Sequence, residues 1–212
     1  MTTYHPDEAL LLDYASGATD EAHALIVATH LSFCAQCRAN VAAMETIGGA
    51  LLDATAPVAV QADALNRALA RLETAVPVAR PRRDAKRDAT PAPLRPYIGD
   101  LDAVRWRAIG PNLAYVDLFR RGPVKARLIK GTPGIDPGHH SHYGLEYTMA
   151  LRGGYTDCTG SYGPGDLQVA DASLLHCPIA DPGEDCISLA VTTGRLRFQS
   201  LLGKIAGPIF GF

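Results

Sequence analysis

The chain has 212 residues, 47% hydrophobic and 20% charged, with a formal net charge of −2, which suits a soluble globular protein of one or two domains. No run approaches the roughly 18 apolar residues that span a bilayer, and the N-terminus lacks the features of a signal peptide, so we expect a cytoplasmic protein. Residues 1–75 contain nine acidic and three basic residues, which argues against direct nucleic-acid binding and suits either a basic partner or simply a soluble acidic face.

The first third of the chain is predicted to be helical. Pro6 and the acidic residues after it are typical of a helix start, and Gly17 is a natural stop for that helix. We expect Thr19 to cap a second helix that ends near the His30–Cys34 region. A third helix is predicted over Ala35–Leu52. A short fourth helix is predicted over Ala62–Glu73, where leucines recur at helical spacing.

The middle of the chain differs in composition from both of its flanks. Residues 76–96 contain six basic and two acidic residues together with several prolines, which predicts an extended, solvated linker. From residue 97 onward, short β-rich segments alternate with glycine, proline and aspartate turns. We therefore predict a multidomain α + β protein with a small helical domain at residues 1–75, a linker at 76–96 and an all-β sandwich or jelly-roll barrel at 97–212.

A first set of candidate metal ligands lies in the helical region. His30, Cys34 and Cys37 stand at positions i, i+4 and i+7, which places them on one helix face, and thiolates with imidazole suit zinc. His5 is the better candidate for a fourth ligand and His23 the competitor. A thioredoxin-like redox pair and two buried, metal-free cysteines are the alternatives. The five cysteines are odd in number and irregularly spaced, so a disulfide framework is not expected.

A second set of candidate ligands lies in the β-rich region. His140 and His142 share one face of a predicted strand, while His139 points to the other face. Glu146 follows after a turn and His176 comes from a later strand. Three imidazoles and one carboxylate suit zinc, iron, manganese, nickel or copper. Cys158, Cys177 and Cys186 are candidates for oxidation, although inert core cysteines are the more common case.

Two family resemblances follow from these motifs. The spacing His-x3-Cys-x2-Cys in a small helical region resembles the zinc-binding anti-sigma domain. The second set resembles the cupin signature, whose first motif is matched in full, by Gly134, His140, His142, Glu146 and Gly153. The second cupin motif is matched only at Gly165 and His176, since Asp171, Ser173 and Ala180 stand where the family has proline, glycine and asparagine. This favours cupin metal binding over cupin catalysis.

The two motifs in this order resemble the ChrR family of anti-sigma factors over nearly the full length. The resemblance implies that residues 1–75 bind an extracytoplasmic-function-type sigma factor and block its access to RNA polymerase. It implies one zinc ion at His5, His30, Cys34 and Cys37 and a second at His140, His142, Glu146 and His176. It also implies sigma release under singlet oxygen or related oxidative stress. The alternatives are a metal-dependent cupin dioxygenase, isomerase or hydrolase with a regulatory N-terminal domain, and a metal-storage or scaffold protein.

Overall fold

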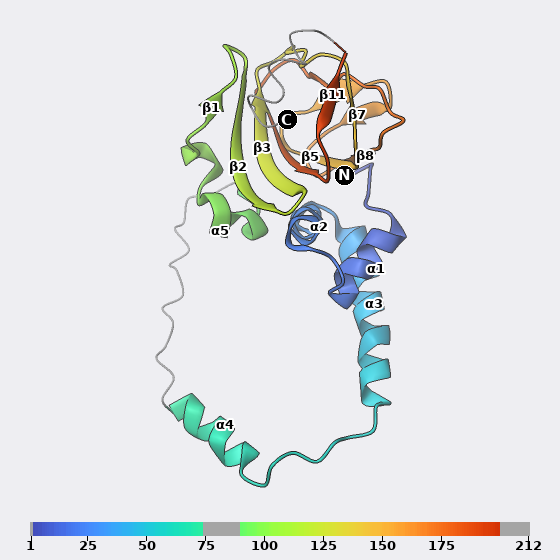
Figure 1. Ribbon diagram of the computed structural model, residues 1–212, viewed down its shortest axis with the longest axis vertical. Coiled ribbons are helices and arrows are strands. Elements are labelled where there is room, and N and C mark those ends of the chain that lie inside the picture. Colours follow the sequence, from blue (N-terminus) through green and yellow to red (C-terminus); the bar gives the residue numbers. More distant parts are fainter. Residues whose placement is uncertain (1, 74–89, 200–212) are drawn as a thin grey trace.

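A helical N-terminal region is followed by a β-rich C-terminal region in the computed structural model, which describes residues 2–73 and 90–199 (Figure 1). This confirms the predicted fold class. The helices are α1 (Glu8–Ser16), α2 (Glu21–Phe33), α3 (Ala35–Asp53), α4 (Ala64–Glu73) and α5 (Arg95–Ile98), with 3-10 turns η1 (Ala92–Leu94) and η2 (Leu101–Ala103). Within these described residues, no helix combines the length and apolar character needed to cross a membrane.

Local sequence signals explain how the first two helices begin and end. Asp7 caps α1 by accepting the backbone N–H of Leu10, and Gly17 ends that helix in the left-handed conformation at φ 74°. Asp20, rather than the predicted Thr19, caps α2 by accepting the backbone N–H groups of Ala22 and His23. An aspartate carboxylate is the stronger acceptor at a helix N-terminus, which explains the shift by one residue.

The described part of the β-rich region, residues 90–199, contains three antiparallel sheets. A six-stranded sheet has the order β1-β2-β3-β10-β5-β8, a three-stranded sheet the order β7-β6-β9, and β11 pairs with β4. The strands are β1 (Arg107–Ala108), β2 (Leu113–Arg121), β3 (Val124–Gly131), β4 (His140–His142), β5 (Glu146–Arg152), β6 (Tyr155–Asp157), β7 (Gly160–Tyr162), β8 (Leu167–Ala170), β9 (Ile179–Ala180), β10 (Cys186–Thr192) and β11 (Leu196–Phe198).

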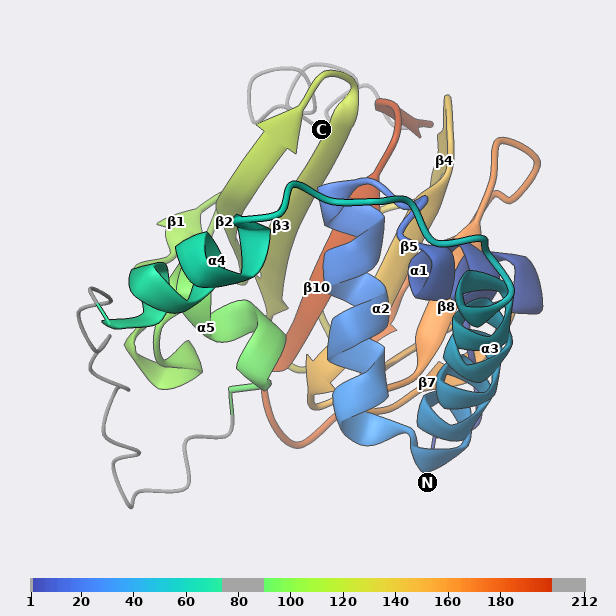
Figure 2. The ribbon, with the colours of Figure 1, turned by 90° about the horizontal axis from the view of Figure 1, so that it is seen from below.

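Helix α2 lies across the six-stranded sheet, over β3, β10 and β5 (Figure 2). Its residues Leu25 and Ile26 are buried in the same apolar cluster as Leu128 and Leu189 of the sheet. The opposite side of α2 contributes Val27 to a second cluster with α1 and α3. One helix therefore belongs to the cores of both regions.

The C-terminal end of the predicted linker packs against the core of the β-rich region. Residues 90–96 are not extended and solvated: Thr90 and Leu94 are buried, and Leu94 joins the cluster of α2 and the sheet. A buried leucine overrides the proline-rich composition because it removes apolar surface from water. Residues 74–89 of the predicted linker lie outside the described residues. The division into domains at residues 75 and 97 stays a prediction.

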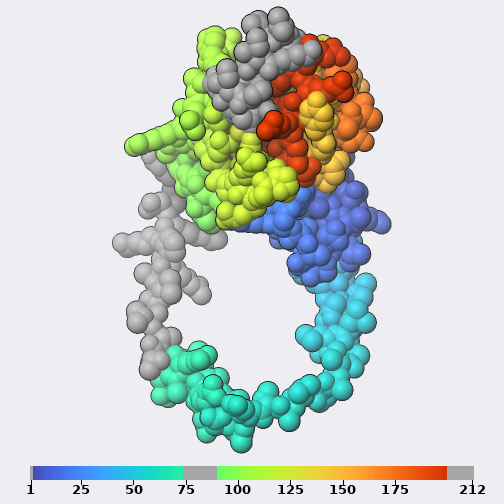
Figure 3. Space-filling view, in the orientation of Figure 1, coloured from blue at the N-terminus to red at the C-terminus, as the bar shows by residue number. Residues whose placement is uncertain are grey.

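Helices α3 and α4 extend away from the β-rich region (Figures 1 and 3). The leucine stripe predicted for the fourth helix is present but faces solvent: Leu65, Leu69 and Leu72 are 69%, 50% and 72% exposed. The C-terminal half of α3 also exposes apolar side chains, at Ile47 and Leu51. Exposed apolar side chains gathered over neighbouring elements are typical of an interaction surface.

Candidate metal centres

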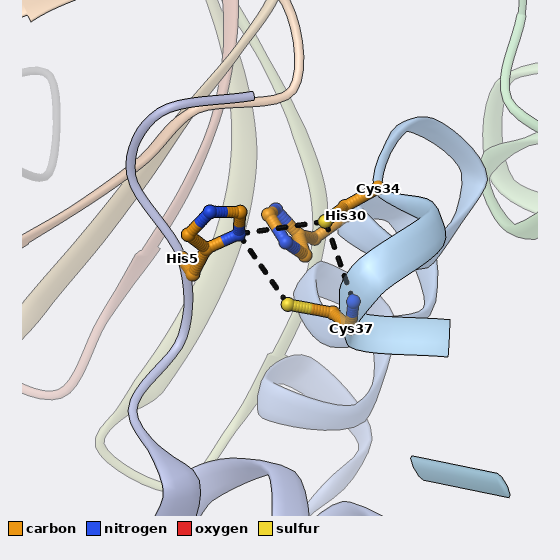
Figure 4. A group of neighbouring side chains, drawn as sticks. All are labelled: His5, His30, Cys34 and Cys37. Atoms are coloured by element: carbon orange, nitrogen blue, oxygen red, sulfur yellow. Dashed lines mark hydrogen bonds between the residues drawn. The ribbon is translucent and has the colours of Figure 1, made fainter. Parts of the chain in front are cut away.

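The first predicted ligand set converges from three parts of the helical region (Figure 4). His5 precedes α1, His30 lies in the last turn of α2, Cys34 caps the N-terminus of α3, and Cys37 lies in its first turn. The Nδ1 atom of His5 lies 3.4 Å from the Sγ atoms of both cysteines. One potential ligand atom from each of these four residues lies within 4.8 Å of the others, which is a separation that a single ion can bridge.

The competitor His23 lies outside this group. Its Nδ1 atom is 2.7 Å from the carboxylate of Asp20, and its ring packs edge-on against Tyr147 of β5. The distinction comes from position: His23 follows the helix cap at i+3 and pairs with the capping carboxylate. His5, from the segment before α1, lies edge-on to His30 at a centroid distance of 5.6 Å.

The ring of His30 is prepared to be a ligand. Its Nδ1–H donates to the carbonyl oxygen of Gly165 at 2.7 Å, which leaves the lone pair on Nε2. That Nε2 is the one buried side-chain nitrogen or oxygen atom, among the described residues, without a hydrogen-bond partner. Burial lowers the pKa of His30, so the ring is neutral near pH 7. A buried, orphaned lone pair in a residue grouped with two thiols fits a metal ion.

The two thiols are inequivalent. Burial opposes ionisation of Cys34, but hydrogen bonds, including the one from the backbone N–H of Cys37, lower its pKa. Burial, together with the neighbouring Cys34, raises the pKa of Cys37 to about 12. A helix N-terminus stabilises the Cys34 thiolate, as it does in other reactive or ligating cysteines. In the described segment before Cys34, residues 2–33, there is no strand of the kind that the thioredoxin-like alternative would require.

The second predicted ligand set also converges, inside the β-rich region. His140 and His142 come from β4, Glu146 from the start of β5, and His176 from the segment before β9. His142 Nε2 lies 3.1 Å from His176 Nε2 and 3.5 Å from a carboxylate oxygen of Glu146. All four residues are buried, and their ligand atoms lie within 4.8 Å of one another. His139 is not part of this group, as expected.

Hydrogen bonds orient two of these rings toward the centre of the group. His140 Nδ1–H donates to the carbonyl of Gly138 at 2.9 Å, and His176 Nδ1–H donates to Asp157 at 2.8 Å. Both Nε2 atoms therefore carry lone pairs, which is the usual arrangement of metal-binding histidines. Burial lowers the pKa values of His140 and His142 to about 4 and raises that of Glu146 to about 7. The donor set fits a divalent cation.

An apolar cavity of about 210 Å³ adjoins the second group. His140 and Glu146 form part of its wall, and Tyr155 and Thr148 add polar atoms. The remaining lining is mainly apolar: Ile109, Leu113, Ile129, Ile135, Pro137, Leu196 and Phe198. A cavity of this kind beside a set of potential metal ligands offers space for a small molecule.

The candidate oxidation sites differ in accessibility. Cys177 and Cys186 are buried, and burial raises the pKa values of their thiols to about 11 and about 12. The Cys177 thiol also donates to Asp136 at 2.7 Å. These features favour inert structural thiols, because the thiolate is the reactive form. Cys158 is exposed.

The chain is similar to a known protein over nearly its whole length. No family model matches it. It is 42% identical over 208 residues to the anti-sigma-E factor ChrR of Cereibacter sphaeroides, covering 98% of this chain and 97% of the relative. The chain belongs to the ChrR family of anti-sigma factors. This family membership identifies a transcriptional regulator rather than an enzyme.

A solved structure of a ChrR chain agrees with this assignment. The ChrR chain in the crystal structure of Rhodobacter sphaeroides SigE with the anti-sigma ChrR is 39% identical, with a TM-score of 0.78, covering 91% of this chain and 99% of that one. An RmlC-like cupin from Ralstonia eutropha matches 46% of this chain at 19% identity and a TM-score of 0.40.

Sequence reasoning missed the residues around the two ligand sets. Asp157, which orients His176, and Gly165, whose carbonyl orients His30, come from distant parts of the sequence. The sequence indicates Gly165 only as a glycine of the second cupin motif. A carboxylate or a carbonyl that supports a ligand has no fixed sequence spacing from it, so no signal in one sequence identifies it.

Proposed function

We propose that this chain is an anti-sigma factor whose helical N-terminal region binds an extracytoplasmic-function-type sigma factor and withholds it from RNA polymerase. The observation that carries this proposal is the full-length likeness to ChrR, including a ChrR chain that was solved in complex with SigE. Sigma factors and RNA polymerase act in the cytoplasm, so we place the protein there as well.

The surface chemistry of the helical region supports this role. Leu51 on α3 and Leu65, Leu69 and Leu72 on α4 are exposed by half or more. The region is also acidic, which suits a basic partner. Helices with exposed apolar stripes dock into apolar grooves of partner proteins. We propose that α4 and the end of α3 form the sigma-binding surface.

A binding assay with a matched control tests this surface. The full chain should bind SigE of R. sphaeroides, and Leu69→Asp should weaken binding at least about tenfold, the loss expected for a central interface residue (about 1.4 kcal/mol). Leu175→Asp in the β-rich region is the control, because Leu175 is 41% exposed but lies far from α4 in sequence. Unchanged binding of Leu69→Asp would remove α4 from the interface, and absence of binding by the full chain would contradict the sigma-factor proposal with this partner.

We also propose that both ligand groups bind zinc. Two thiolates and two imidazoles form a closed set for a structural ion, which would supply a cross-link between the segment before α1, α2 and α3. Three imidazoles and one carboxylate at the second group suit zinc as well. Elemental analysis of the purified chain should find two zinc ions, and one in a Cys34→Ser/Cys37→Ser variant. Iron or copper in place of the second zinc would contradict its assignment.

The β-rich region is proposed to detect oxidative stress, such as singlet oxygen, and to cause release of the sigma factor. The supporting observation is the second ligand group beside a cavity open to small molecules. In a reporter strain driven by the cognate sigma factor, His142→Ala in the full chain should keep repression and lose induction. Deleting residues 85–212 is a harsher test, because it also uncovers the buried face of α2. Normal induction by His142→Ala would show that the second group does not sense the signal.

A further inference from the structure

One short turn contacts both His30 and the backbone directly before His5. The turn of residues 163–166 joins β7 to β8. The Gly165 carbonyl accepts the His30 ring N–H at 2.7 Å. The neighbouring Asp166 carboxylate accepts the backbone N–H groups of Thr3 and Tyr4, directly before His5. Two adjacent residues of the β-rich region therefore position two of the four potential ligands in the helical region.

The packing around this turn leaves little room for movement. Gly165 has φ +93°, and a Cβ atom there would lie 2.6 Å from Phe33 of α2 and 2.7 Å from Thr2. The N-terminal segment also bonds to strand β8 at the edge of the sheet, because the backbone N–H of Leu167 donates to the carbonyl of Tyr4 at 3.2 Å. A displacement of the turn would therefore displace the backbone next to His5 and the end of α2.

The same turn leads directly into a hydrogen-bonded route to the second ligand group. Strand β8 starts at Leu167, and its buried Gln168 donates to Asp157 Oδ2 at 2.7 Å. That same carboxylate oxygen accepts the His176 Nδ1–H at 2.8 Å. The Asp157 and His176 side chains are 0% and 1% exposed. A continuous set of buried contacts therefore runs from His176 through Asp157, Gln168 and β8 to the turn.

We propose that this route, defined by Asp157, Gln168 and the turn of residues 163–166, couples the two metal centres, so that an ion at the second group strengthens metal binding at the first. This inference rests on the metal binding proposed above. His176 would help to hold the ion at the second group, and its fixed ring would in turn hold Asp157, Gln168 and the start of β8 in place. The turn then holds His30 and the backbone before His5 in ligating positions. Because coupling between binding sites is reciprocal, metal at the first group strengthens binding at the second by the same factor.

Cobalt(II) provides a site-specific probe of this coupling. Only the first group contains cysteines, so only it produces a thiolate-to-cobalt charge-transfer band. The metal-free full chain is titrated with Co²⁺ against a competing chelator, with His142 intact or replaced by alanine. His142 is a member of the second group but not of the route. We expect His142→Ala to weaken cobalt binding at the cysteines at least about fivefold, the lower end of typical coupling.

Variants of the route distinguish coupling through these residues from a general destabilisation of the fold. Gln168→Met keeps the size of the side chain but removes its bonds to Asp157 and Thr159, and should make the cobalt affinity independent of His142. Thr156→Val is the control, because Thr156 bonds to Ser161 and Asp181 outside the route, and it should keep the full dependence. Should Gln168→Met not fold, Asp166→Asn, which weakens the hold on residues 3 and 4, should also reduce the dependence.

The outcomes distinguish failure of the coupling from failure of the metal binding on which it rests. Equal cobalt affinity with and without His142 overturns the coupling, and a full dependence in Gln168→Met overturns the route. Absence of the charge-transfer band in the unmodified chain instead contradicts metal binding at the first group. Reciprocity adds a second measurement: Cys34→Ser should weaken cobalt binding at the second group by the factor found for His142→Ala.

Discussion

Replacing Ile26 of α2 by alanine tests whether the helical region shares its core with the β-sheet. Ile26 is 0% exposed and packs in the cluster that contains Leu94 and Leu189, which are also 0% exposed. Isoleucine-to-alanine substitutions in such sites cost about 2–5 kcal/mol, because the cavity that remains cannot collapse. With neighbours this closely buried, we expect a loss of at least about 3 kcal/mol.

The chain provides its own probe for this experiment. Trp106 is the single tryptophan, lies in the β-rich region and packs against the same cluster. Urea unfolding followed by Trp106 fluorescence should show a midpoint about 1.5 M lower for Ile26→Ala, given a slope near 2 kcal/mol per M. Leu12→Ala, at a position 54% exposed on α1, should change the stability by less than about 0.5 kcal/mol. An unchanged Trp106 transition in Ile26→Ala would refute the shared core.

Two further predictions concern the turn and the second ligand group. Gly165→Ala should destabilise the chain more than Gly122→Ala in thermal unfolding, because both glycines have positive φ but only Gly165 lacks space for a Cβ atom; equal losses would contradict the close packing. In the metal-free chain, the pKa values of His140 and His142 are about 4, below the usual 6.5 of the unfolded chain. The unfolded chain therefore binds protons first as the pH falls, so the stability present above pH 6.5 is lost as the pH falls toward 4. The raised pKa of Glu146, about 7, acts in the opposite direction. Glu146→Gln should therefore make the free energy of unfolding in urea fall more steeply between pH 6.5 and 4.5. A shallower fall would contradict these shifts.

The sequence predicted much of the candidate sites because their ligands obey local periodicities. His30, Cys34 and Cys37 follow helical spacing, and the structure brings them together at the junction of α2 and α3. His140 and His142 follow the two-residue period of a strand. The sequence favoured His5 over His23 as the fourth ligand, but it could not show how the segment before α1, which lies outside any helix, folds back on the rest of the chain.

The packing of α2 on the sheet and the ordered segment before residue 97 depend on tertiary contacts, which leave no periodic signal in one sequence. The apolar residues of α2 indicated a helix with a buried face, but not that Leu25 and Ile26 pack on strands β3, β5 and β10, which lie more than 90 residues away in sequence. Likewise, the proline-rich composition before residue 97 predicted an extended segment, whereas burial of Leu94 orders its last residues. Long-range burial outweighs local composition in both cases.

The position of α2 constrains how the sigma factor could be released. If the β-rich region separated completely from the helices, the buried faces of Leu25 and Ile26 would meet water, at about 1.5–3 kcal/mol for each side chain. The His30 bond to Gly165 and the backbone bonds at Asp166 would be lost as well. A signal at the second ligand group would have to supply all of this energy at once. A shift of the turn of residues 163–166 breaks fewer contacts and acts directly on the first ligand group, so under the proposed function a local rearrangement would transmit the signal at lower energetic cost than separation of the two regions.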